Sequence, residues 1–164
     1  MAFKEQFTQQ EWRTLQLTVM WVFQAVAGAD NKIDKKEKAA LQQAMNNSKR
    51  IINDLAREVI DSIKSSQENV DDVLAADQRE MWHGIREASA ILSKKIDPKI
   101  EIGFKKTLIA IGVHIGESSG SLFGNKFSKD EVEVVKQLGA LLGVSVVDLK
   151  QPPTIQQIIE SLKA

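Results

Sequence analysis

The chain has 164 residues, which is enough for one domain with a sizeable core, and its 22 acidic and 22 basic side chains cancel. This balance argues against a surface built mainly for nucleic acid or acidic lipid, and the lack of cysteine excludes disulfides, thiolate metal sites and a cysteine nucleophile. The apolar run over 15–29 is interrupted by polar residues and preceded by acids. We therefore expect neither a cleaved signal peptide nor a membrane span, and we expect a cytoplasmic protein.

The first predicted helix starts near the N-terminus. Thr8 and Glu11 have the spacing of a capping box, in which each side chain accepts a free backbone N–H of the other residue. Phe7 and Trp12 can pack together as a hydrophobic staple across this helix start. Apolar side chains then recur at helical spacing as far as Val26, which predicts a largely buried helix.

The stretch 24–41 predicts the end of this helix, a tight acidic turn and the start of a second helix. Asp30 and Asn31 are residue types that end a helix in a turn or a left-handed conformation. Asp34 followed by Glu37 is a second capping box, so a new helix is expected to begin there. Three carboxylates therefore fall within one corner of the chain.

The middle of the chain predicts three further helical segments. Apolar residues from Ile51 to Ile63 define a third helix, and residues 70–76 form a short helix or turn. Asp77 is expected to open a longer helix that runs through Leu92.

The second half begins with the most apolar helix. Asp97 caps it, Pro98 occupies its first position, and it extends over roughly 99–116. A glycine- and serine-rich loop follows over 117–126, and Ser128 with Glu131 caps the next helix. Residues 144–149 are expected to form a short helix, and Thr154 with Gln157 caps the last one.

These elements predict an all-α, single compact domain of about eight helices. The order of apolar helix, turn and capped helix occurs twice, which predicts two pseudo-symmetric repeats that pack around their first helices. The expected units are repeat 1 over 8–65, central helices over 70–96, repeat 2 over 98–150 and a C-terminal helix over 154–164.

The doubled pattern resembles the TerB family, named for tellurite-resistance proteins, whose motif is an apolar helix followed by Asp-Gly-x-Ile/Phe-x-x-x-Glu, present twice. The first copy matches at 29–37, ADNKIDKKE, with Asn31 in place of the usual glycine. The second copy matches at 108–112 and 127–131, with a longer loop between them and Ile115 or Gly124 at the expected aspartate.

The resemblance implies a non-enzymatic, stress-associated module for binding or sensing. It further implies Ca²⁺ or another divalent cation at the acidic turn, and a protein partner that is membrane-associated in part of the family. A nucleic-acid partner is not expected, and a homo-oligomer is compatible with the resemblance.

The candidate metal ligands are Asp30, Asp34 and Glu37 in the first turn. Because Ca²⁺ takes about six to eight oxygen ligands, three carboxylates with turn carbonyls and waters approach such a set. Capping equally explains Asp34 and Glu37, and turn formation explains Asp30, so both interpretations stay open. The second turn supplies a weaker set, namely Glu117, Asp130 and Glu131.

Catalytic signals are weak in this sequence. The two histidines, His83 and His114, lie far apart along the chain, which argues against a zinc or acid–base site, and no nucleophile–base pair is recognisable. Two alternatives remain beside the metal-binding module. One is a scaffold that binds a protein through the 117–126 loop or an exposed helix groove, and the other is an enzyme without a recognisable motif.

Titration with Ca²⁺ and Mg²⁺ tests the metal hypothesis. A divalent ion that binds only the folded chain raises its melting temperature. We expect Asp30→Ala to abolish that rise, because it removes one of three carboxylates in the turn. No change of melting temperature with any divalent ion, or a rise that persists in Asp30→Ala, would contradict the hypothesis.

Overall fold

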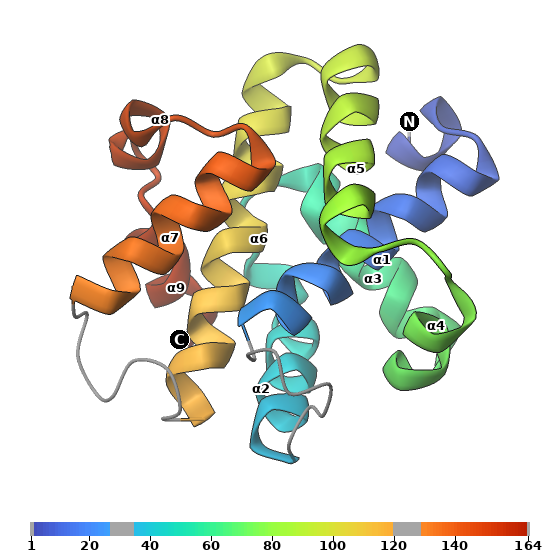
Figure 1. The fold of residues 1–164 in the computed structure, drawn as a ribbon, viewed down its shortest axis with the longest axis horizontal. Helices are drawn as coiled ribbons and strands as arrows, with labels where there is room; N and C mark the ends of the chain where they lie inside the picture. The colour runs from blue at the N-terminus through green and yellow to red at the C-terminus, as the bar shows by residue number, and fades with distance from the viewer. Residues whose placement is uncertain (1, 27–34, 120–128, 164) are drawn as a thin grey trace.

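The computed structural model describes residues 2–26, 35–119 and 129–163, and within these ranges the chain is helical and contains no strand (Figure 1). The predicted all-α class with about eight helices is therefore confirmed. The α-helices are α1 (Gln9–Val26), α2 (Lys35–Asn46), α3 (Asp54–Ser66), α4 (Val70–Ala76), α5 (Met81–Lys95), α6 (Pro98–Ser119), α7 (Lys129–Leu142), α8 (Val146–Lys150) and α9 (Ile155–Lys163). Two 3₁₀ helices, η1 (Phe3–Gln6) and η2 (Ser48–Arg50), complete the described elements. None of the described helices is both long enough and apolar enough to cross a bilayer.

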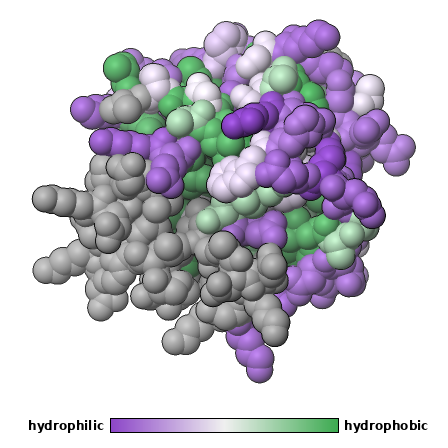
Figure 2. Space-filling model, in the orientation of Figure 1, coloured by the Kyte–Doolittle hydropathy of each residue, from purple (hydrophilic) through white to green (hydrophobic). Residues whose placement is uncertain are grey.

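Helix α6 lies at the centre of the fold. Every residue from Phe104 to Ile115 is buried, so this helix is covered on all sides rather than along one stripe. Helices α1, α2 and α9 pack against it, as do α3, α5 and α7 (Figure 1). Apolar side chains reach the surface in a narrow strip over α6 between α5 and α7 (Figure 2).

Helix α1 is the second buried helix, and it packs against α5, α6, α3 and α4. The predicted contact between the two apolar first helices is therefore present, as α1 against α6. Helix α2 lies on α6 and α3. The pseudo-symmetry of the two proposed repeats stays a prediction.

Helix starts follow the local sequence closely. The Thr8–Glu11 box is formed, with Oε2 of Glu11 accepting from the Thr8 N–H at 2.8 Å and Oγ1 of Thr8 accepting from the Glu11 N–H at 3.1 Å. The Thr154–Gln157 box is formed in the same way at 2.8 and 3.3 Å. Helix α6 begins at Pro98, as predicted from the Asp97–Pro98 pair.

Two predicted helix starts are wrong. Helix α5 begins at Met81 rather than Asp77, because Oδ1 of Asp77 accepts the backbone N–H of Arg79 at 2.9 Å and holds this stretch in a turn. Helix α3 begins at Asp54 rather than near Ile51, because the side chain of Asn53 caps it by accepting from the Ala56 N–H at 2.9 Å.

A glycine sets the distance between α1 and α5. A methyl group on Gly84 would lie 2.3 Å from Cη2 of Trp21, so the indole occupies the space that any other side chain would need. Both residues are buried. The α1–α5 contact therefore depends on a residue without a side chain in the first turn of α5.

We expect Gly84→Ala to lower the free energy of unfolding by about 1 to 3 kcal/mol, because the methyl group would displace the Trp21 ring. The intrinsic helix propensity of alanine acts in the opposite direction, by about 1 kcal/mol. Urea unfolding measures the difference, and Arg86→Ala, at an exposed position of the same helix, is the control. A more stable Gly84→Ala variant would show that α1 and α5 can separate at little cost.

Candidate functional site

Two adjoining hollows lie along the N-terminal half of α1. The first hollow, between α1 and the segment from α4 to α5, has a volume of about 1480 Å³, and the second, between α1 and α5, has about 480 Å³. Thr8, Gln10 and Arg79 line both. We call the combined depression the α1 groove.

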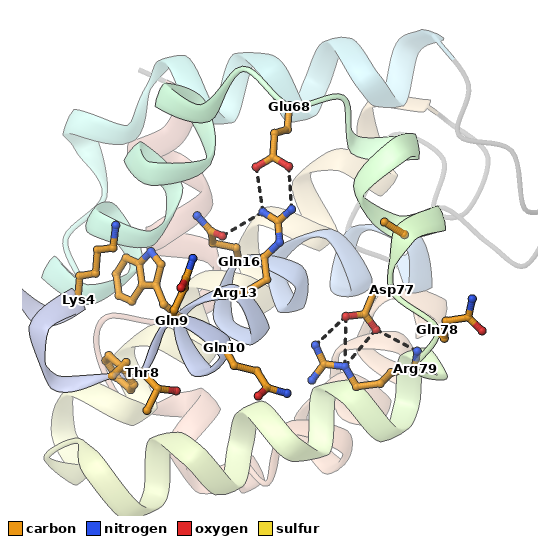
Figure 3. A pocket seen from close by; sticks show the side chains of 13 residues that line it. Lys4, Thr8, Gln9, Gln10, Arg13, Gln16, Glu68, Asp77, Gln78 and Arg79 are labelled. Atoms are coloured by element: carbon orange, nitrogen blue, oxygen red, sulfur yellow. Dashed lines mark hydrogen bonds and ion pairs between the residues drawn. The ribbon is translucent and has the colours of Figure 1, made fainter.

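An arginine of α1 forms one wall of the first hollow. Nη1 and Nη2 of Arg13 donate to the two carboxylate oxygens of Glu68 at 3.0 and 2.7 Å, which is the bidentate geometry of a strong pair (Figure 3). Arg13 Nη1 also donates to Oε1 of Gln16 at 3.2 Å, and Nε2 of Gln16 donates to Oγ of Ser62 on α3 at 3.0 Å. Hydrogen bonding from Arg13 lowers the pKa of Glu68.

Arg79 lies where the two hollows meet. Arg79 donates from Nε and Nη2 to Asp77, with the shortest contact at 2.8 Å (Figure 3). Its Nη1 donates to Oε2 of Glu87 at 2.7 Å. Its Nη1 also donates to Oγ1 of buried Thr14 at 2.9 Å. The guanidinium carbon lies 5.2 Å from the centre of the Trp21 ring, within the range of a cation–π contact.

Lys95 of α5 lines the second hollow and contacts the start of α1. Nζ of Lys95 donates to Oε2 of Glu11 at 2.6 Å and to the carbonyl oxygen of Gln6 at 3.3 Å. Its ammonium group lies 5.9 Å from the centre of the Phe7 ring. The hydrogen bond from Lys95 is the main cause of a lowered pKa at Glu11.

Trp12, which lines the first hollow, has a buried N–H group without a hydrogen-bond acceptor among the described residues. Trp12 packs on Phe7 with ring centres 5.9 Å apart, as the predicted staple requires, and it is buried. Its Nε1–H is buried and has no hydrogen-bond acceptor in the part of the chain that the structure describes. An unpaired buried donor costs about 1 to 3 kcal/mol.

The structure does not describe the side chains of the six predicted metal ligands. Asp30 and Asp34 lie outside the described residues. The other four are Glu37 in α2, Glu117 in α6, and Asp130 and Glu131 in α7. The structure describes the backbone of these four residues but not their side chains. No cluster of three or more acids or histidines suited to a metal occurs among the described side chains. The metal hypothesis therefore stays a prediction.

The histidines are placed apart. His83 is exposed on α5, with Nε2 at 3.1 Å from Oε1 of Glu87, whereas His114 is buried in α6. The structure does not bring them together. Sequence reasoning named several residues of the α1 groove only as parts of helix starts, namely Phe7, Thr8, Glu11, Trp12 and Asp77. It did not join them into one site, because the ion pairs of the groove connect segments up to 84 residues apart.

Comparison with protein-family models, with curated proteins and with solved structures finds no match in any of the three. The resemblance to the TerB family, with the stress-associated role that it implies, therefore stays a prediction. A function for this chain is accordingly inferred from the geometry of the α1 groove.

Protonation of Asp77 should weaken the fold at low pH. Hydrogen bonds from Arg79 hold the pKa of this carboxyl below its ordinary value, against the opposing effect of burial. A carboxyl with a lower pKa in the folded chain contributes stability above its unfolded pKa of about 3.9, and that contribution is lost as pH falls through the folded value.

We expect Asp77→Asn to lower the free energy of unfolding by about 1 to 2 kcal/mol at pH 7, and the difference from the unmodified chain to disappear at acidic pH. Urea unfolding across this pH range is the measurement. Glu80→Gln, at the exposed cap position of α5 where the side chain makes no cap hydrogen bond, serves as the control. A difference that is independent of pH would contradict the assignment.

Proposed function

We propose that this chain is a non-enzymatic binding module, and that its ligand is a segment of another polypeptide lying along the α1 groove. The observation that carries the proposal is the continuity of the two hollows. They meet over Thr8, Gln10 and Arg79, so a ligand that follows α1 can occupy both.

The size and openness of the groove favour a polymer over a metabolite. Small-molecule pockets have volumes of about 300 to 1000 Å³ and enclose most of the ligand. The first hollow alone, at about 1480 Å³, exceeds that range, and the second hollow continues it. An extended segment can use this length without being enclosed.

The lining chemistry suits a polypeptide backbone. The side-chain amides of Gln9, Gln10 and Gln78 are exposed in the first hollow, and they make no hydrogen bond within the described residues. Each amide offers both a donor and an acceptor, which is what the alternating N–H and C=O groups of an extended chain require. A ligand carbonyl that reaches Nε1 of Trp12 after a neighbouring side chain moves would also relieve its missing hydrogen bond.

The electrostatics of the groove support binding rather than acid–base catalysis. The pKa values of Glu11, Glu68 and Asp77 are all lowered by hydrogen bonds from a lysine or an arginine. A general acid or base works best with a pKa near the working pH, which requires a shift in the opposite direction. These carboxylates therefore hold the lining side chains in place.

Selection from a random peptide library, followed by amide chemical-shift mapping of the chain with the selected peptides, tests the proposal. We expect shifts concentrated at residues 8–16 and 76–79. Gln10→Tyr should reduce affinity at least tenfold, because a bulky side chain at the junction obstructs the groove.

The matched control is Gln43→Tyr, an exposed glutamine of α2 that lines neither hollow. It should bind the selected peptides like the unmodified chain. If no peptide binds, or if the shifts map to another surface, the α1 groove is not a peptide site.

A further inference from the structure

Nearly all charged groups in the α1 groove are already paired. The carboxylates are Glu11, Glu68, Asp77 and Glu87, and the cations are Lys4, Arg13, Arg79, Lys94 and Lys95. Each carboxylate lies within 2.8 Å of a lysine or arginine nitrogen in this same set. A ligand therefore meets no unpaired carboxylate among the described residues of the groove.

Two lysines are left without a carboxylate. Lys4 lines the first hollow and Lys94 lines the second, and both are exposed. Neither ammonium group makes an ion pair or a hydrogen bond within the described ranges. The chain as a whole has no net charge, so this surplus of positive charge is a property of the groove and not of the composition.

The position of Lys4 is fixed by the fold although its ammonium group is free of partners in the described ranges. The backbone N–H groups of Phe3 and Lys4 donate to the two carboxylate oxygens of Glu58 on α3, at 2.8 and 2.9 Å. Lys94 lies in the last turn of α5, next to Lys95, which binds Glu11. Both ammonium groups are therefore carried on backbone that is anchored at the two sides of α1.

A nucleic acid fits this groove less well than a peptide. A phosphate backbone carries a charge at every nucleotide, whereas the described residues of the groove offer only two ammonium groups without a carboxylate partner, Lys4 and Lys94. Single-stranded nucleic acids are also bound by exposed aromatic rings, whereas Phe7 and Trp12 in this groove are buried. A segment with a few separated carboxylates matches two isolated ammonium groups better.

We infer that the α1 groove receives an extended acidic segment of a partner protein, with one carboxylate bound by Lys4 and another by Lys94. This inference rests on the proposed function and adds the charge of the ligand and the two residues that recognise it. Complementary charge of this kind contributes mainly to specificity and to the association rate, and its effect falls as salt rises.

The test uses synthetic peptides with two glutamates at varied spacing, and the same peptides with glutamine in place of glutamate. Calorimetric titration of the full chain should show the glutamate peptides binding more tightly, with affinity that falls as salt concentration increases. Lys4→Gln and Lys94→Gln should each weaken binding about 2- to 5-fold, the effect of one exposed ion pair, and the double variant should combine both losses.

Lys49→Gln, at an exposed lysine of η2 outside both hollows, is the matched control and should bind like the unmodified chain. Melting temperatures of all variants confirm that each is folded. Oligothymidylate and vesicles containing phosphatidylserine are included as anionic competitors.

The outcomes separate the two proposals. Glutamine peptides that bind the groove as tightly as the glutamate peptides, or lysine variants with unchanged affinity, would overturn the acidic-segment inference and leave the proposed function intact. Displacement of the peptides by oligothymidylate or by the vesicles at lower concentration would overturn the assignment to a protein partner. If neither these synthetic peptides nor any peptide of the random library binds the chain, both the acidic-segment inference and the proposed function are overturned.

Discussion

The burial of α6 from Phe104 to Ile115 is the constraint on which the other helices depend. Two consecutive lysines, Lys105 and Lys106, lie within its buried stretch, and a buried ammonium group is costly unless it is paired. Nζ of Lys105 donates to Oε1 of Glu101 at 2.6 Å and to Oγ of Ser89 on α5 at 2.9 Å. Nζ of Lys106 donates to the carbonyl oxygen of Gln151, between α8 and α9, at 2.9 Å, and burial lowers the pKa of Lys106. Each lysine thus determines where one neighbouring segment lies.

This arrangement extends from α6 to the α1 groove. Ser89, which accepts from Lys105, donates to the carbonyl oxygen of Leu142 at 3.1 Å and so connects α5 with the end of α7. On the same helix, Gly84 faces Trp21 of α1 at close range. Trp21 in turn lies beneath the guanidinium of Arg79. The junction of the two hollows is therefore a consequence of core packing.

The sequence was sufficient where a feature depends on a few neighbouring residues. The Thr8–Glu11 capping box and the start of α6 at Pro98 involve side chains at most three positions apart, so local spacing specifies them. Asp77 shows the limit of this reasoning. Its sequence context suits a helix cap, but its carboxylate instead accepts from the backbone N–H and the guanidinium of Arg79, and that guanidinium is itself placed by Thr14 and Glu87.

The α1 groove was less predictable than the fold for the same reason. Arg13 and Glu68 are 55 residues apart, and nothing in the sequence near either one indicates the other. The unpaired Nε1–H of Trp12 is a property of its three-dimensional surroundings among the described residues, and the spacing that predicted its packing on Phe7 does not reveal it. Recognition of a site from sequence requires that its residues share a local pattern, and these residues do not.

The energetics of the ion pairs indicate why they gather along the groove. The Arg13 and Glu68 side chains are 37% and 41% exposed, and pairs with that exposure contribute little to stability. Stability therefore gives little reason for this pair, although the less exposed Arg79–Asp77 pair contributes more. The main physical effect of the four pairs is to fix the positions of donors and to neutralise each of the described carboxylates there. The ammonium groups of Lys4 and Lys94, which have no carboxylate partner among the described residues, then leave this surface with a surplus of positive charge that repels cations and favours anions.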